Sequence, residues 1–201
     1  MALVGNGRRP VNVLTFQLYR RPRFAIPTMN TWHRAFLILL VLCTCIGCDQ
    51  VSKDLAQVNL RTAEPLALLG GMLHLYYAEN AGAAFSLGAG LDHPMRYWLF
   101  TVGAGLMLIG LFCFAVIRRE STAMQVLAYA LVLGGGMSNL LDRLFNEGRV
   151  IDFMMIKVGA VHTAIFNLAD VMILAGCLLL IIVLWRPQYP GKLNDAIGSG
   201  Y

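Results

Sequence analysis

The sequence reads GGGMSNLLDR at residues 134–143, VIDF at 150–153 and FNLAD at 166–170, so three carboxylates lie in or beside long apolar runs. An ionisable side chain at membrane depth costs kilocalories per mole, and it usually marks a functional site with a nearby partner. Asn139 and Asp142 are three residues apart, as are Asn167 and Asp170. On a helix each amide therefore lies on the same face as its carboxylate. The pattern predicts one site built from these two units and the loop that carries Asp152.

The composition is typical of a membrane protein. Hydrophobic residues make up 58% of the 201 residues, charged residues make up 13%, and the mean hydropathy is +0.64. Soluble chains are less apolar and more highly charged. The five cysteines all fall in apolar runs and no histidines have the spacing of metal ligands, so we expect no disulfide framework, metal or cofactor. The basic residues lack the interleaved aromatic residues of a base-stacking surface, which argues against a nucleic-acid partner.

Four segments are long and apolar enough to cross a bilayer, and we expect an all-α polytopic membrane protein. They are residues 35–51, 97–117, 124–141 and 168–185, each close to the roughly 20 residues that span about 30 Å of hydrocarbon. Arginines flank these segments at Arg34, Arg118 and Arg186. Basic flanks favour the cytoplasm, so both termini should be cytoplasmic.

The ends of the chain differ from its middle. Residues 1–31 contain several arginines and three prolines, so we expect a basic, poorly ordered tail. Residues 32–186 should form the membrane domain, and residues 187–201 a cytoplasmic tail. Two segments, 54–95 and 144–165, should lie on the outer side.

The outer segment 54–95 has two features of its own. Gly70 and Gly71 precede a β-favouring run, which predicts a small β-element between the first two spans. The run ends at NAGAAF (80–85), where small residues would let a substrate backbone approach while Asn80 forms hydrogen bonds. A tight turn on the membrane surface is an equally good interpretation of this motif alone.

Polar residues inside the spans all fall at their outer ends, which favours a one-sided site over a conduit. An ion or proton path would need polar steps through the cytoplasmic half of the membrane. The residues at the outer ends are Asp49, Lys53, Asn139, Asp142, Arg143, Asn167 and Asp170.

Five motifs together resemble the lipoprotein signal peptidases, or type II signal peptidases. They are DQVSK (49–53), NAGAAF (80–85), NLLDR (139–143), VIDF (150–153) and FNLAD (166–170), in the family's order. The resemblance implies an aspartic endopeptidase of the bacterial cytoplasmic membrane. It would remove the signal peptide from diacylglyceryl-modified prolipoproteins by cleaving just before the lipidated cysteine. It also implies an active site at the extracytoplasmic boundary, with prolipoproteins and membrane lipids as partners, and we expect a monomer.

Spacing alone leaves Asp142, Asp152 and Asp170 as candidates for catalysis. The resemblance assigns the catalytic pair to Asp152 and Asp170. Two carboxyls are needed because the ionised one removes a proton from water while the protonated one donates to the scissile carbonyl oxygen. Asp142, beside Arg143, fits a structural ion pair or a hydrogen-bonding role.

The resemblance and the spacing also predict residues that support the site or bind substrate. Asp49 and Lys53 are four apart on one helical face and should pair. The full supporting set is Asp49, Lys53, Asn80, Gly82, Asn139, Asp142, Arg143 and Asn167. A small transporter or proton-coupled subunit that uses Asp142 and Asp170 as relay carboxylates is the first alternative, and a purely structural membrane assembly factor is the second. A protease needs Asp152 within reach of Asp170, whereas a relay has no use for a loop carboxylate.

Overall fold

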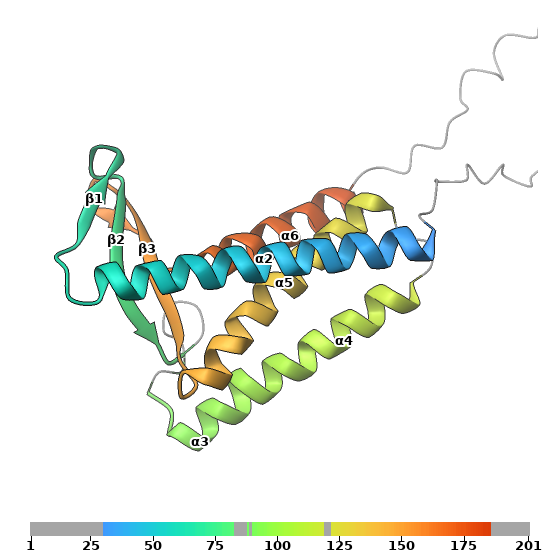
Figure 1. Cartoon of the computed structure of the whole chain (residues 1–201), viewed down its shortest axis with the longest axis horizontal. Helices are drawn as coiled ribbons and strands as arrows, with labels where there is room; N and C mark the ends of the chain where they lie inside the picture. Colours follow the sequence, from blue (N-terminus) through green and yellow to red (C-terminus); the bar gives the residue numbers. More distant parts are fainter. Residues whose placement is uncertain (1–29, 83–87, 89, 119–121, 186–201) are drawn as a thin grey trace, which may run out of the picture.

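The computed structural model describes residues 30–185 except 83–87, 89 and 119–121, and it forms a bundle of long helices with a sheet at one end (Figure 1). Four helices have the length and hydropathy of membrane spans: Thr31–Leu60, His93–Ile117, Ala123–Phe145 and Leu168–Trp185. Large apolar side chains on their outer faces are exposed, including Phe36, Leu39, Phe112, Leu174 and Ile182. The predicted all-α polytopic fold is confirmed. Most of both predicted tails lies outside the described residues.

The first helix is longer than the predicted span. Helix α2 (Thr31–Leu60) begins after Asn30, whose side chain accepts a hydrogen bond from the backbone N–H of Trp32. The second span is continuous through α3 (His93–Arg96), η3 (Tyr97–Val102) and α4 (Gly103–Ile117), with π-helical geometry in η3. Because α2 continues beyond residue 51, its last turns, up to Leu60, extend toward the sheet.

Helix α5 (Ala123–Phe145) lies at the centre of the bundle and packs against α2, α4 and α6 (Leu168–Trp185). Its three consecutive glycines each face a different neighbour. A Cβ atom at Gly134 would lie 2.6 Å from Cβ of Cys45 in α2, and one at Gly136 would lie 2.6 Å from Leu108 in α4. A Cβ atom at Gly135 would overlap the carbonyl oxygen of Ala169 in α6. The glycine run therefore permits close packing on three sides at one level.

The sheet contains four antiparallel strands in the order β1-β2-β3-β4. Their bounds are β1 Leu66–Leu68, β2 Leu73–Asn80, β3 Val150–Val158 and β4 Val161–His162. The 3-10 turn η1 (Leu69–Gly71) joins β1 to β2, and both of its glycines have positive φ. The predicted β-element between the first two spans is therefore present, as β1 and β2.

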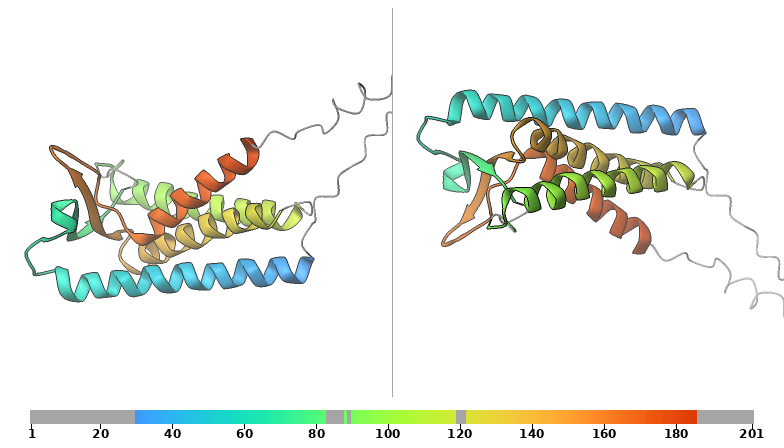
Figure 2. Two further views of the ribbon diagram at one scale, coloured as in Figure 1. Left: turned by 90° about the horizontal axis from the view of Figure 1, so that it is seen from above. Right: turned by 90° about the horizontal axis from the view of Figure 1, so that it is seen from below.

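The sheet is larger than the sequence predicted. The segment with Val150 and Asp152, which we expected to be a loop, is strand β3, because its valines, isoleucines and phenylalanine favour extended structure and find a partner in β2. Ala78 lies opposite Asp152 in this pairing. Figure 2 shows from two further sides that the sheet stands at the end of the bundle where α5 finishes and α6 begins.

Candidate active site

Asp152 lies on β3 and is 3% exposed. Both of its carboxylate oxygens accept hydrogen bonds: Oδ1 from Nδ2 of Asn167 at 2.8 Å and Oδ2 from Nδ2 of Asn80 at 3.0 Å. Burial and the charge of Asp170 raise the pKa of Asp152, while the Asn80 and Asn167 hydrogen bonds oppose the shift, and the net result is a pKa of about 6. A carboxyl with this pKa can hold or release a proton near neutral pH.

Asp170 lies in the first turn of α6, and Asn167 connects it to Asp152. Oδ2 of Asp170 accepts from the backbone N–H of Asn167 at 3.2 Å, and the backbone N–H of Asp170 donates to Oδ1 of Asn167 at 3.0 Å. This reciprocal arrangement has the logic of a capping box, because each side chain satisfies a free N–H at the helix start. One residue thus hydrogen-bonds to both candidate catalytic carboxylates.

Asn139 holds Asp170 from the side of α5. Its Nδ2 donates to Oδ1 of Asp170 at 2.9 Å. Its Oδ1 accepts from Nζ of Lys53 at 2.9 Å and from Nδ2 of Asn167 at 3.1 Å. Because a lysine ammonium is only a donor, it fixes the oxygen of this amide on its own side and directs the nitrogen toward Asp170.

Lys53 is 1% exposed and uses all three N–H groups. Besides Asn139, its Nζ contacts Oδ2 of Asp49 at 2.6 Å and Oδ2 of Asp142 at 2.8 Å. The expected pairing of Asp49 with Lys53 along one helix face is therefore present. The expected ion pair of Asp142 with Arg143 is wrong, because Asp142 faces α2 and takes Lys53 as its cation.

The carboxylates of Asp49 and Asp142 also accept hydrogen bonds from the backbone of neighbouring elements. Oδ1 of Asp49 accepts from the backbone N–H of Ala169 at 2.7 Å, and Oδ2 of Asp142 accepts from the backbone N–H of Ile151 at 3.1 Å. Each acceptor therefore holds the residue just before a candidate catalytic aspartate. This buried cluster, which we call the lysine network, consists of Lys53, Asp49, Asp142 and Asn139.

Arg143 lies between the lysine network and the motif around Asn80. It donates from Nη1 to the backbone oxygen of Asn139 at 3.3 Å and from Nη2 to that of Gly82 at 3.2 Å. Oδ1 of Asn80 accepts from the backbone N–H of Gly82 at 2.9 Å, which makes a tight turn. The buried Nε of Arg143 has no hydrogen-bond partner among the described residues. The remainder of this motif, residues 83–85, lies outside them.

A cleft of about 450 Å³ opens beside Asp152, within the usual size range of ligand sites. It runs along the sheet between β2 and the segment that follows β4, and it is lined by Ala78, Asn80, Met155, Thr163 and Ile165. Asp152 is itself part of the lining, so a peptide lying in this cleft would lie beside it.

The structure brings all ten predicted site residues to the junction of α2, α5, α6 and the sheet. Two polar residues that the sequence motifs do not single out, Gln50 and Ser138, complete the lysine network. Nε2 of Gln50 donates to Oδ1 of Asp142 at 2.8 Å, and Oγ of Ser138 donates to Oδ2 of Asp49 at 2.7 Å. Both lie inside the quoted motifs or next to them, but only the packing of α2 on α5 reveals their partners. Among the described residues, no group of three or more His, Cys, Asp or Glu side chains is arranged to hold a metal.

Comparisons with known proteins agree on one family. A family model described as signal peptidase (SPase) II matches residues 24–186. The lipoprotein signal peptidase of Leifsonia xyli subsp. xyli is 39% identical over 173 residues, which cover 83% of this chain and 76% of that protein. The lipoprotein signal peptidase of Syntrophus aciditrophicus is 37% identical over 141 residues, which cover 70% and 86%.

Solved structures share the fold. Two structures described as bacterial membrane enzymes match with TM-scores of 0.66 and 0.65, each at 24% sequence identity. The first match covers 78% of this chain and 92% of the solved chain, and the second covers 75% and 93%.

Proposed function

We propose, because this chain belongs to the signal peptidase II family, that it is the membrane aspartic endopeptidase that removes signal peptides from diacylglyceryl-modified prolipoproteins. Cleavage occurs just before the lipidated cysteine. The observation that carries the proposal is the pair of carboxylates, Asp152 and Asp170, that Asn167 joins by hydrogen bonds. A relay through the membrane would have no use for Asp152, which lies on a strand outside the spans.

Asp152 and Asp170 form the catalytic dyad and share one proton. The ionised carboxylate takes a proton from a water molecule as that water attacks the scissile carbonyl carbon. The protonated carboxyl gives its proton to the carbonyl oxygen, so a neutral tetrahedral diol forms. When the diol collapses, the C–N bond breaks, one carboxyl protonates the leaving nitrogen and the other takes a proton from the diol. The raised pKa of Asp152 supports this sharing, because it brings the exchange of the proton closer to neutral pH than an ordinary carboxyl would allow.

The other polar residues position the dyad or the substrate. Asn167 and Asn139 orient the two carboxylates, and the lysine network braces the backbone just before each of them. Asn80 and Gly82 line the approach of the substrate backbone. Arg143 holds the turn at Gly82 in place through its Nη2 hydrogen bond.

The cleft beside Asp152 receives the residues around the cleavage site in extended form, with the sheet as its floor. The diacylglyceryl group then remains in the bilayer beside the helices, where exposed apolar side chains surround it. One chain contains a complete site, so a monomer suffices for the reaction.

We place the enzyme in the bacterial cytoplasmic membrane with both termini in the cytoplasm and the dyad at the outer boundary. The basic flanks of the apolar segments support this orientation. Residues 32–186 are the catalytic domain, and residues 1–31 and 187–201 are tails without a catalytic role. A reporter that is active only outside the cytoplasm, fused at Tyr201, should give no signal. A strong signal from that fusion would contradict the proposed orientation, but it would not bear on the catalytic mechanism.

Cleavage of a diacylglyceryl-modified prolipoprotein in membranes tests the function. The wild-type chain should release the signal peptide, and Asp170→Asn should not. Asp54→Asn is a matched control, because Asp54 is an exposed aspartate in the part of α2 that is nearest its C-terminal end. Failure of the wild-type chain to cleave a substrate that another signal peptidase II accepts would contradict the proposal.

A further inference from the structure

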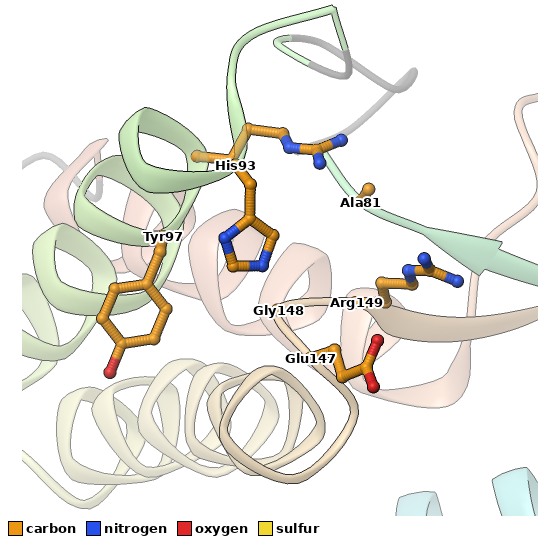
Figure 3. A pocket seen from close by; sticks show the side chains of 7 residues that line it. Ala81, His93, Tyr97, Glu147, Gly148 and Arg149 are labelled. Atoms are coloured by element: carbon orange, nitrogen blue, oxygen red, sulfur yellow. The ribbon is translucent and has the colours of Figure 1, made fainter.

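A second, smaller pocket lies apart from the cleft, between the start of α3 and the turn that leads into β3. It has a volume of about 40 Å³, against the roughly 10–15 Å³ that a cavity needs to hold one water, so it can admit a group of a few heavy atoms. Figure 3 shows His93 projecting from α3 toward the turn at Glu147 and Gly148, with Arg149 near Ala81. Arg96 and Tyr97 complete the lining. None of these residues belongs to the dyad or the lysine network.

The start of the second span, beside the pocket, has the composition that is typical of a membrane interface. Tyr97 and Trp98 begin the apolar part of this span and are 40% and 66% exposed. Aromatic residues of this kind concentrate where hydrocarbon meets water. His93 and Arg96 come just before them, on the water side. Leu99, which follows, is 54% exposed and faces the acyl-chain region.

The charges around the pocket suit a single negative charge. Arg96 and Arg149 supply two guanidinium groups. Arg149 donates from Nη1 to Oε2 of Glu79 at 2.8 Å, and among the described residues this is the only hydrogen bond in which its guanidinium takes part. Its other N–H groups are therefore available to a ligand. Glu79 also lies 4.0 Å from Arg61, so the three arginines exceed Glu79 and Glu147 by one positive charge, which suits a singly charged anion better than a multiply charged one.

We propose that this pocket binds the phosphodiester of a glycerophospholipid from the leaflet on the sheet side. Arg96, Arg149 and His93 donate hydrogen bonds to the phosphate oxygens, as guanidinium groups do in other phosphate sites. The hydroxyl or amine of the headgroup faces Glu147. The acyl chains lie along Trp98 and Leu99, so the lipid anchors this corner of the enzyme beside the cleft.

Binding of fluorescent dioleoylphosphatidylglycerol to the full-length protein in neutral detergent tests the proposal. We expect one tight site per chain in the wild type. Arg96→Gln and Arg149→Gln should each weaken binding by about tenfold, since each removes a charge-assisted contact. Lys157→Gln is the matched control, because Lys157 is an exposed cation on β3 outside the pocket, and it should bind as the wild type does. Equal affinity in the wild type and both arginine variants would overturn the site.

Two further measurements separate the possible ligands. Soluble glycerophosphoglycerol at the lipid's own concentration should not displace the probe, and dioleoylglycerol, which lacks phosphate, should not bind. Displacement by the soluble phosphodiester at equal concentration would mean a free phosphate compound and would overturn the lipid assignment. Displacement by an acidic peptide instead would assign the pocket to substrate side chains and would also overturn it. His93→Phe removes a donor without removing a fixed charge, so a weaker, partial loss there supports the site even if an arginine variant misfolds.

Discussion

Asn167 donates its side-chain amide to Oδ1 of Asp152 at 2.8 Å, and its own backbone N–H donates to Asp170. A single residue at the start of α6 therefore fixes a carboxylate on a strand relative to a carboxylate on a helix. The two elements are β3 and α6, and the sequence alone does not predict how they are oriented relative to each other. Catalysis by two carboxyls depends on that relative placement.

Asn167→Ala should lower kcat by about a hundredfold with little change in KM, because a small misplacement of reacting groups has an effect of that size. The loss of the helix cap should also lower stability by about 1 kcal/mol. Steady-state cleavage and thermal unfolding of the purified variant measure both effects. A rise in KM with kcat unchanged would assign Asn167 to substrate binding instead.

The raised pKa of Asp152 makes stability depend on pH in a defined direction. The folded state holds this proton up to about pH 6, whereas the unfolded chain releases it near the ordinary value of 3.8. Between these values the folded state binds more protons, so the stability contribution of Asp152 falls as the pH rises. Asp152→Asn cannot titrate, so the stability of Asp152→Asn relative to the wild type should increase from about pH 4 to about pH 6 and then stay level.

Unfolding temperatures of both proteins between pH 4 and pH 8 measure this difference. Asp54→Asn, at an exposed aspartate, serves as the control and should show no such rise. A difference that is constant over the whole range would mean that burial does not raise the pKa of Asp152.

Lys53→Met should destabilise the protein by about 3–5 kcal/mol, because it leaves Asp49 and Asp142 buried without their cation. The matched change Lys157→Met, at an exposed lysine, should have little effect. Adding Asp142→Asn to Lys53→Met should cost less than the sum of the two single changes, since the pair acts together. Chemical unfolding of the four proteins completes the cycle, and strict additivity would show that the two residues do not interact.

Gly135→Ala should reduce both stability and cleavage, because the new methyl group would overlap the carbonyl oxygen of Ala169 and push Asp170 outward. Gly110→Ala is the control, since a Cβ atom there meets no other atom within 4 Å. It should be neutral or slightly stabilising, because alanine favours a helix more than glycine does. Unchanged cleavage in Gly135→Ala would show that α5 and α6 do not set the position of the dyad.

Local patterns in the sequence predicted much of this structure, because they depend on neighbours along the chain. Four apolar segments, the pairing of Asp49 with Lys53 at helical spacing and the glycine turn before β2 are all local features. The same reasoning correctly brought the Asn-x-x-Asp units to one end of the bundle.

The errors concern contacts between distant segments. The sequence predicts a loop where the structure has strand β3, because only pairing with β2, which lies about 70 residues earlier in the chain, makes this segment a strand. The sequence pairs Asp142 with its neighbour Arg143, whereas the packing of α2 on α5 brings Nζ of Lys53 within 2.8 Å of Oδ2 of Asp142. Such contacts follow from how helices pack, which spacing within one segment does not determine.

Single-turnover cleavage of a diacylglyceryl-modified prolipoprotein by equal folded amounts of wild type, Asp152→Asn, Asp170→Asn and the double variant tests the dyad most directly. Each single change should lower the single-turnover cleavage rate by several orders of magnitude, while the variant still binds the substrate. The double variant should be hardly worse than either single change, because the two groups act as one unit. Normal turnover in Asp152→Asn, together with none in Asp142→Asn, would show that the catalytic carboxylates are a different pair.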